Sequence, residues 1–502
     1  MITRQTLTYL LVILLLLLGT GCIPQEPILV YVTPTLAEPG AEATSVPTLT
    51  LPSATPSDMA VSATSTLTHT PAPPTATTPP PTVDPRATVI GAVIGQDYTL
   101  PPTSTPLPTE TGLPPTVSPT ATTMPSATAG GPRPTSLPGL DAARMGIQLD
   151  PTLNQQDWNQ AVVDIQRLGV KWLKVQVAWK SLQPNGPDEI SEDFRRLEIY
   201  LETAFNSGLD IMVSIAKAPN WARAVDQNED GPPDNPQALA DFISLMLGEF
   251  GTSLDAIEVW NEPNLVREWR GALPFNGAGY MQLFEPSYRA IRAFSPTLPV
   301  ITAGLAPTDD NPSVGSRNDR SFLEEMYAAG LAQYADVGVG IHPYGWGNAP
   351  DSTCCDLNPE PGWDDDPHFF FLDNVNDFRA IMVSNGHSAA RLWATEFGWA
   401  SWDGFPGEAP DVWMTYVDEC EQGQYTVRAF EMAQGWDYMG PMILWNLNFA
   451  LLTGMVENRD ERAAYSLLTP LNPRERAAYW MLFDAVRPDE QLPSYSRCPG
   501  PG

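Results

Sequence analysis

Two glutamates in this chain end apolar runs, where carboxylates are uncommon. Glu262 lies in "EVWNEPNL" after the run "LDAIEVW", and Glu396 lies in "ARLWATEFGW". Glutamate is seldom buried unless it is paired or takes part in a reaction. Two carboxyl groups in one cleft can act as acid and base, because burial and mutual repulsion push their pKa values apart. Cleavage of a glycosidic bond requires such a pair, one carboxyl neutral and the other ionised.

Polar and aromatic residues accompany both glutamates. Asn261 precedes Glu262, "IHPYGW" supplies His342 and Tyr344, and "ILWNL" supplies Trp445. The apolar faces of sugar rings pack on tryptophan, and sugar hydroxyls need polar partners. These residues are therefore candidates for a sugar-binding site. His342 and Tyr344 are also compatible with ordinary buried side chains that satisfy their hydrogen bonds within the fold.

The elements that must hold these residues alternate along the chain. From about residue 140, each short apolar strand is followed by a stretch with apolar residues at helical spacing. Eight strand–helix pairs predict an α/β fold, a (β/α)8 TIM barrel. A doubly wound open sheet is the alternative, but the glycine-rich phosphate loop usual in that fold is missing. The expected strands cover 145–149, 171–179, 209–216, 254–260, 299–306, 335–342, 390–399 and 441–449, and the expected helices cover 154–169, 191–208, 235–251, 279–294, 320–330, 371–386, 422–436 and 473–486.

A barrel of this kind carries its active residues at the carboxyl ends of the strands. Glu262 ends the fourth expected strand, His342 and Tyr344 end the sixth, Glu396 lies in the seventh and Trp445 in the eighth. Both glutamates should therefore face one cleft. Because the fourth and seventh strands lie on opposite sides of a narrow barrel mouth, we expect the carboxyl groups to be about 5–5.5 Å apart.

The motifs "WNEPN" and "TEFGW" resemble the acid/base and nucleophile strands of clan A glycoside hydrolases, which are retaining enzymes built on (β/α)8 barrels. "APNWA" after the third strand, "WNEPNL" and "IHPY" suggest similarity to family 39, or to a family 5-like relative. The resemblance covers about residues 140–488. It implies that Glu262 is the acid/base and Glu396 the nucleophile, with Tyr344 near the nucleophile and His342 on the same wall.

The same resemblance implies that Asn261 hydrogen-bonds the 2-hydroxyl of the reacting sugar and that Trp445 forms a platform for the sugar ring. The chain departs from the family pattern near the end of the second strand. Many relatives carry an arginine there, whereas this chain has "AWKSLQP". Trp179 or Lys180 is therefore expected to meet the substrate in a different way.

The N-terminal part of the chain has a different character. The apolar run from Leu10 to Leu18 is too short to span a bilayer and is typical of a secretory signal peptide. Small residues then lead to Cys22, which resembles the acylated cysteine of bacterial lipoproteins. We predict a lipoprotein signal peptide over 1–21 and a disordered Thr/Pro/Ser-rich linker over 22–139. A plain signal peptide with an incidental cysteine, or an uncleaved anchor helix, is the alternative.

Charge and cysteine content limit the partners. Lys and Arg number 27 against 59 Asp and Glu, a net charge of −32, which repels phosphate backbones and anionic lipid. We therefore expect no nucleic acid partner, and contact with a membrane only through a lipid on Cys22. Cys354, Cys355, Cys420 and Cys498 permit disulfides in an exported chain but leave their pairing open. No zinc-ligand spacing is present, and we expect no metal or other cofactor.

Together these features predict a barrel domain over 140–488 and a C-terminal tail over 489–502. The predicted function is hydrolysis of O-glycosidic bonds, of β configuration, in a poly- or oligosaccharide, with retention and by a double displacement. The enzyme would be exported to the bacterial cell surface. The alternative is a catalytically inactive carbohydrate-binding or adhesive surface protein on the same barrel. The sequence sets neither the sugar nor the oligomeric state.

Overall fold

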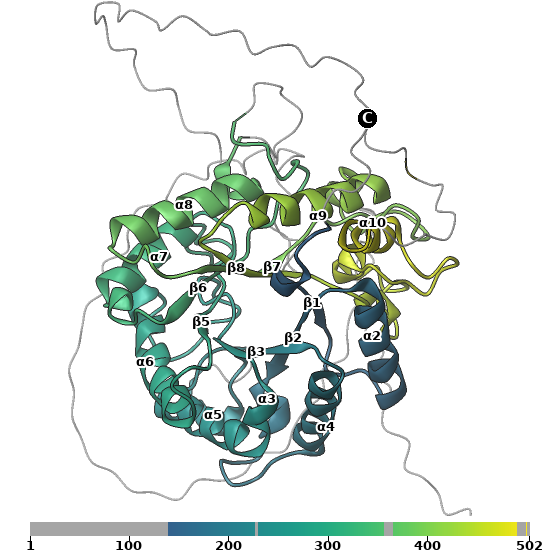
Figure 1. The fold of residues 1–502 in the computed structure, drawn as a ribbon. Coiled ribbons are helices and arrows are strands. Elements are labelled where there is room, and N and C mark those ends of the chain that lie inside the picture. The colour runs from purple at the N-terminus through teal and green to yellow at the C-terminus, as the bar shows by residue number, and fades with distance from the viewer. Residues whose placement is uncertain (1–138, 226–228, 356–364, 489–497, 499–502) are drawn as a thin grey trace, which may run out of the picture. The chain divides into compact units, whose positions relative to one another are not determined.

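The computed structural model describes residues 139–225, 229–355 and 365–488 together with Cys498. Within these residues eight parallel strands close into one barrel, in the order β1 to β8, with helices around it (Figure 1). β8 pairs with β1, with Ile443 beside Gly146, which excludes an open sheet and confirms the predicted (β/α)8 fold. The strands are β1 (Met145–Leu149), β2 (Trp172–Ala178), β3 (Asp210–Ala216), β4 (Ala256–Val259), β5 (Val300–Thr302), β6 (Val337–Ile341), β7 (Leu392–Phe397) and β8 (Met439–Leu444).

The helices that cover the barrel begin and end at residues suited to those positions. Ser191 accepts a hydrogen bond from the backbone amide of Phe194 at the start of α4, and Gly169 follows α2 with a φ of 92°. That left-handed conformation favours glycine, which has no Cβ. The long helices of the described residues are α2 (Gln155–Leu168), α4 (Glu192–Asn206), α5 (Gln237–Phe250), α6 (Gly277–Phe294), α7 (Asp319–Ala328), α8 (Phe371–Ser384), α9 (Glu419–Gln434) and α10 (Ala477–Val486).

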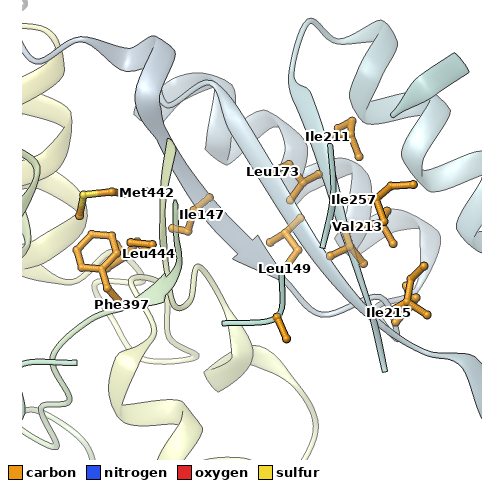
Figure 2. Packing of buried hydrophobic residues seen from close by; sticks show 14 of the residues in the cluster. Ile147, Leu149, Leu173, Ile211, Val213, Ile215, Ile257, Phe397, Met442 and Leu444 are labelled. Atoms are coloured by element: carbon orange, nitrogen blue, oxygen red, sulfur yellow. The ribbon is translucent and has the colours of Figure 1, made fainter. Parts of the chain in front are cut away.

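Buried apolar side chains of the described residues form three clusters, and two of these contain residues of the barrel strands. The larger layer packs the strands against the helices and includes Leu173 of β2, Val213 of β3 and Ile257 of β4 (Figure 2). Because successive residues of a strand point to opposite faces, the same strands also supply a layer inside the barrel. The polar residues two positions further along these strands therefore pack on this inner layer of apolar side chains. The inner layer consists of Trp172, Met212, Ala256, Ile301, Trp393 and Ile443.

The end of β2 corrects one prediction. β2 stops at Ala178, and Trp179 begins a single helical turn, α3 (Trp179–Leu182). The Trp179 indole packs against side chains of neighbouring elements. It is fully buried, stacks on Phe242 of α5, meets Trp221 edge-on and donates a hydrogen bond to Gln183. Trp179 therefore packs within the fold and is not positioned to contact a substrate.

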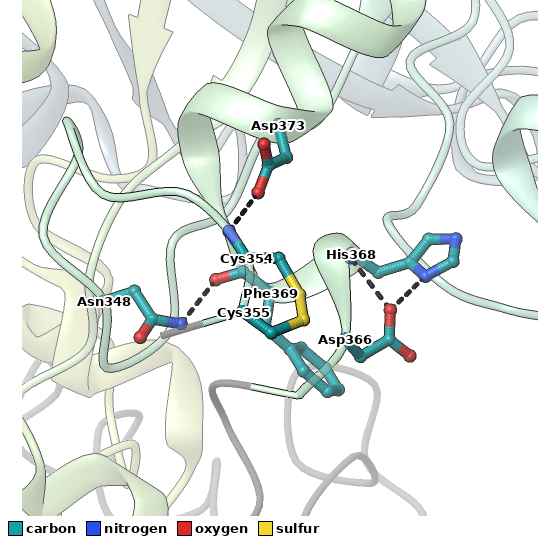
Figure 3. The surroundings of a disulfide bond; sticks show 7 residues. All are labelled: Asn348, Cys354, Cys355, Asp366, His368, Phe369 and Asp373. Carbon is teal, nitrogen blue, oxygen red and sulfur yellow. Dashed lines mark hydrogen bonds and ion pairs between the residues drawn. A yellow bond between two sulfur atoms is a disulfide. The ribbon is translucent and has the colours of Figure 1, made fainter. Parts of the chain in front are cut away.

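Two disulfides join the four cysteines whose pairing the sequence left open. Cys354 bonds to its neighbour Cys355 after β6, and Cys420 in α9 bonds to Cys498. Figure 3 shows the first of these bonds near the start of α8, where the backbone amide of Cys354 donates to the carboxylate of Asp373. The first bond joins chain neighbours, whereas the second joins the start of α9 to a residue 78 positions later.

The described helices all lack the combination of length and apolar character that crossing a membrane would need. The predicted signal peptide, Cys22 and residues 23–138 of the predicted linker lie outside the described residues. What the sequence predicts for these three segments therefore remains a prediction.

Candidate active site

A cavity of about 300 Å³ opens at the carboxyl ends of the strands. Five of the predicted site residues line it, namely Asn261, Glu262, Tyr344, Glu396 and Trp445. Its volume is at the lower end of the roughly 300–1,000 Å³ usual for small-molecule sites. The other lining residues are Gln148, Leu149, Asp150, Pro151, Thr152, Gln176, Val177, Ala178, Ala216, Lys217, Arg267, Glu268, Phe449 and Arg462.

The two glutamates approach each other from different sides of the barrel. Glu262 follows β4, and Glu396 lies in β7. One oxygen of each carboxylate and one ring nitrogen of His342 all lie within 4.8 Å of one another. This spacing is close to the about 5–5.5 Å between the carboxyl groups of retaining glycosidases, and well below the about 6.5–9.5 Å of inverting ones.

The turn that presents Glu262 has an uncommon backbone conformation. After β4 ends at Val259, Trp260 and Glu262 adopt φ angles of 77° and 40°. Non-glycine residues rarely hold left-handed conformations, so tertiary contacts must stabilise them. The backbone amide of Glu262 donates to the carbonyl of Gly304 at 3.0 Å, and the indole of Trp260 donates to the carbonyl of Glu268 at 3.1 Å. These bonds fix the Glu262 carboxylate in the cavity.

Glu262 is paired with a cation and with a histidine. Arg267 Nη2 lies 2.7 Å from its Oε2, and His342 Nδ1 lies 3.1 Å from its Oε1. Burial alone raises the pKa of this carboxyl, but the hydrogen bond from His342 and the charge of Arg267 outweigh burial, so the pKa of Glu262 is lowered. The surroundings therefore favour the carboxylate form of Glu262.

Three side chains hold Glu396. The Tyr344 hydroxyl donates to Oε2 at 3.0 Å, and Lys174 Nζ donates to Oε1 at 3.0 Å. When the Gln148 amide is turned so that its nitrogen faces Glu396, it donates to Oε1 at 3.2 Å and accepts from the Trp445 indole at 3.3 Å. Both oxygens of the Glu396 carboxylate are thus held in one orientation. A fixed orientation favours nucleophilic attack by this carboxylate on a bound substrate.

His342 lies behind the two carboxylates and not on the cavity wall where the resemblance placed it. Its side chain is fully buried and is not among the residues that line the cavity. Its Nδ1 lies 3.8 Å from Glu396 Oε2 as well as close to Glu262. Gly304 makes room for the ring, because a Cβ there would lie 2.2 Å from it. Burial lowers the pKa of His342, but Glu396 and Glu262 raise the pKa by more, which favours the imidazolium.

Asn261 and Trp445 have surroundings suited to binding a sugar. Asn261 lines the cavity, and its buried Oδ1 has no hydrogen-bond partner in the described part of the chain. A buried amide oxygen needs a donor, which a sugar hydroxyl would supply. Trp445 also lines the cavity, and edge-on contacts with Tyr344, Tyr465 and Phe449 hold its indole in place.

Lys180, which the sequence offered with Trp179 as a residue that meets the substrate, forms an ion pair with Asp230 and does not line the cavity. The sequence did not indicate a cation at Glu396. Lys174, inside β2, supplies this positive charge. The alternation of "WLKVQVA" could have indicated this residue, because Trp172, Lys174 and Gln176 lie on one face of the strand.

The sequence also did not indicate the three charged residues that line the cavity beside Glu262, namely Lys217, Arg267 and Glu268. Lys217 follows β3 with a φ of 62°, lies 3.2 Å from Asp230 and lines the cavity with Arg267 and Glu268. Burial raises the pKa of Glu268 despite the nearby Arg267, and Glu268 Oε2 has no hydrogen-bond partner among the described residues. The position of Lys217 at a strand end could have selected it. Arg267 and Glu268 lie in a loop, where no periodicity gives the direction of a side chain.

One group of acidic and histidine side chains in the described residues has the spacing of a metal site, and it is Glu262, His342 and Glu396 themselves. Lys174 and Arg267 already bring two positive charges to these carboxylates. Repulsion disfavours a further cation there. The arrangement fits acid–base and nucleophilic chemistry carried out by side chains.

Comparisons with known proteins were made on the sequence and on the fold. The sequence profile described as Cellulase (glycosyl hydrolase family 5) matches residues 133–422, more than half of the chain. The match contains the strands that carry Glu262 and Glu396 and ends within α9, before β8. A search of curated proteins found no match.

Among solved structures, the fold is similar to that of a family 39 glycoside hydrolase from the gut symbiont Bacteroides cellulosilyticus, with a TM-score of 0.50 and 16% identity. That similarity covers 68% of this chain and 63% of the other, so the chain spans less than two thirds of that enzyme. A family 39 enzyme from Xanthomonas axonopodis pv. citri has a TM-score of 0.48 and 16% identity, covering 70% of this chain and 67% of the other. At such identities the likeness concerns the fold alone.

Proposed function

The chain belongs to the cellulase family, glycosyl hydrolase family 5, and from this premise we propose that it hydrolyses β-linked O-glycosidic bonds of a poly- or oligosaccharide with retention of configuration. The observation that carries the proposal is the approach of Glu262 and Glu396, with one oxygen of each within 4.8 Å of the other. Because this gap leaves no room for an attacking water between the carboxyl groups, the mechanism that fits is a double displacement through a glycosyl-enzyme.

In the first step Glu396 attacks the anomeric carbon, and Glu262 gives a proton to the leaving oxygen. Arg267 and His342 favour the ionised form of Glu262, so this step needs a change in that pairing. A substrate that separates Arg267 from Glu262 would allow the carboxyl to take up a proton. Glu268 Oε1 lies 3.6 Å from Arg267 Nη1 and offers the guanidinium an alternative partner.

In the second step the roles reverse. Glu262 accepts a proton from water, the water oxygen bonds to the anomeric carbon, and Glu396 leaves as a carboxylate. The paired and ionised form of Glu262 suits this step. Asn261 would hold a hydroxyl of the reacting sugar with its unpartnered Oδ1, and Trp445 would pack on the ring.

We further propose that the enzyme is exported to the bacterial cell surface and tethered there by a lipid on Cys22. Support comes from the apolar run between Leu10 and Leu18 and the small residues that lead to Cys22. The two disulfides also suit an oxidising compartment outside the cytoplasm. The Thr/Pro-rich residues 23–138 would then act as a spacer between the anchor and the barrel.

Hydrolysis of aryl β-glycosides and of β-linked polysaccharides, with two active-site variants, tests the catalytic proposal. Glu396→Ala should abolish turnover of every substrate, because no nucleophile remains. Glu262→Ala should slow polysaccharide cleavage by about 10²–10⁴-fold, because the leaving oxygen needs a proton. It should spare the formation of the glycosyl-enzyme from 2,4-dinitrophenyl glycosides, whose leaving group needs none.

Glu202→Ala, at an exposed position of α4, is the matched control and should behave like the wild type. Equal losses by Glu262→Ala on both kinds of substrate would remove the acid/base assignment. Binding of polysaccharide by the wild-type chain without turnover would favour the alternative, an inactive carbohydrate-binding protein.

A further inference from the structure

A buried ion pair lies in the barrel interior directly beneath Glu396. Lys174 Nζ donates to Glu396 Oε1 and to the backbone carbonyl of Thr395, each at 3.0 Å, and lies 3.1 Å from Glu258 Oε2. The side chains of Lys174 and Glu258 are both 0% exposed. Neither residue lines the cavity, so neither is placed to touch a substrate. The apolar layer two residues earlier in the strands closes this site from below.

The charge of Glu396 changes during the proposed reaction, and that of Glu258 does not. When the glycosyl-enzyme forms, a Glu396 oxygen bonds to the anomeric carbon, while the leaving oxygen departs with the bonding electron pair and takes the proton of Glu262. The Glu396 carboxylate thereby becomes a neutral ester. If Glu396 were the only counterion of the Lys174 ammonium, this buried cation would be left unpaired in the glycosyl-enzyme. An unpaired charge in a protein interior is costly. Glu258 lies outside the reacting set and keeps its charge.

We propose that Glu258 is the permanent counterion of Lys174, which keeps the glycosyl-enzyme from containing an unpaired buried cation. This inference rests on the proposed function. Glu258 and Lys174 are positioning residues, since they act through Glu396. The geometry supports a fixed ion pair, because Glu258 Oε1 accepts a hydrogen bond from the backbone amide of Gly304 at 3.0 Å. Glu258 Oε2 has no aligned hydrogen-bond donor in the described structure and is compensated by Lys174.

The protonation of the pair is consistent with this role. Burial lowers the pKa of Lys174, but Glu258 first and then Glu396 raise the pKa by more, so the net pKa is raised. Burial raises the pKa of Glu258, but Lys174 and then His342 lower the pKa by more. The ammonium and the Glu258 carboxylate are therefore both charged in the resting enzyme, and Glu258 can remain so when Glu396 is esterified.

Glu258→Gln tests the inference, because it keeps the shape of the side chain and removes its charge. In this variant Lys174 loses its last counterion when the ester forms, and regains Glu396 when the ester is hydrolysed. We expect kcat/KM on an aryl β-glycoside, which reports ester formation, to fall by about tenfold or more. Hydrolysis of the ester should be as fast as in the wild type or faster. The lifetime of the ester trapped with a 2,4-dinitrophenyl 2-deoxy-2-fluoro-β-glycoside measures that second step.

The variant Glu258→Asp keeps the negative charge and is the matched control. The ratio of its rates of ester formation and ester hydrolysis should stay near that of the wild type. Equal slowing of both steps in Glu258→Gln, or no change in either, would overturn the inference. If Glu258→Gln does not fold, the double variant Lys174→Met, Glu258→Met removes both charges. Its trapped ester should live at least as long as that of the wild type, because no unpaired cation remains and Glu396 has lost the ammonium that stabilises it as it leaves. A shortened lifetime would contradict the counterion role. Failure of the proposed function can be told apart from failure of the counterion inference. If the proposed function is wrong, the wild type itself shows neither turnover of the glycoside nor a trapped ester.

Discussion

At the scale of single residues, the protonation of Glu262 decides when a catalytic cycle can begin. Its carboxylate lies 2.7 Å from Arg267 Nη2 and 3.1 Å from His342 Nδ1. The anion is the correct form for activating water and the wrong form for protonating a leaving group. Arg267 is therefore expected to limit the pH range in which ester formation can start.

Replacing Arg267 with methionine should extend activity to higher pH. Without the guanidinium, the pKa of Glu262 rises. Because ester formation needs protonated Glu262, kcat/KM falls as pH increases through this pKa, and the basic limb of the profile should move upward by about one pH unit or more. The pH dependence of kcat/KM on a substrate with a poor leaving group measures the shift.

Lys217→Met is the matched control for this experiment. It removes another cation that lines the cavity, but one that pairs with Asp230 and not with Glu262. Its basic limb should stay where it is in the wild type. An unchanged limb in Arg267→Met would show that Arg267 does not govern Glu262.

The sequence was informative about residues whose position follows from a strand end. Glu262, Glu396, Tyr344 and Trp445 line the cavity as the barrel rule predicts. The sequence does not single out Lys174, because a lysine in the middle of a strand suggests a solvent-facing side chain unless the barrel interior is known to contain Glu258 and Glu396. The partners of such a residue come from strands far apart in sequence.

At the scale of elements, a histidine joins the segment before α8 to the start of α7. His368, in the short helix Pro367–Phe369, lies with its Nε2 3.1 Å from Asp319 Oδ1 at the start of α7. Its other ring nitrogen pairs with Asp366 (Figure 3). Burial lowers the pKa of His368, but the hydrogen bonds that its ring nitrogens donate to Asp319 and Asp366 outweigh burial, and the pKa is raised to about 9. Arg320 also pairs with Asp319 and opposes part of this rise.

His368→Asn should therefore destabilise the protein in a pH-dependent way. The folded-state pKa of about 9 exceeds the unfolded value of about 6.5, so the stabilisation is complete below about pH 6.5 and is lost as pH rises through about 9. The difference in Tm between wild type and variant should shrink over that window. Thermal unfolding at a series of pH values measures it.

His387→Asn is a control with the opposite sign. Burial lowers the pKa of His387, which hydrogen-bonds the Tyr327 hydroxyl at 3.0 Å. A lowered pKa means that neutral His387 stabilises the fold at high pH and that this contribution is lost as pH falls below about 6.5. The same pH trend in both variants would contradict the assignment for His368.

Periodicity predicted the elements well and their ends less well. All eight strands and the eight long helices were expected, since the periods of apolar residues are strong over such lengths. The pattern of "KWLKVQVAW" predicts a strand that runs through Trp179, whereas the chain turns into α3 at that residue. The stacking of Trp179 on Phe242 of α5, 63 positions later, is a tertiary contact that no local pattern contains.

At the scale of the whole molecule, the proposed enzyme would be a barrel held at a surface by its N-terminal part. Cys22→Ser should move the protein from the membrane fraction to the soluble fraction, because the lipid attachment site is lost. Its kcat should be unchanged, since the cavity residues all lie between 148 and 462. Fractionation of cells expressing the two forms measures the distribution. Unchanged partitioning of Cys22→Ser would rule out the lipid anchor.

The central claim is that Glu396 forms a covalent glycosyl-enzyme with Glu262 as its acid/base partner. Proton NMR of the first sugar released from a β-glycoside, recorded before mutarotation, tests it most directly. With one oxygen of each carboxylate within 4.8 Å of the other, we expect the β-anomer to appear first. Initial release of the α-anomer would mean a single displacement by water and would contradict the mechanism proposed for this site.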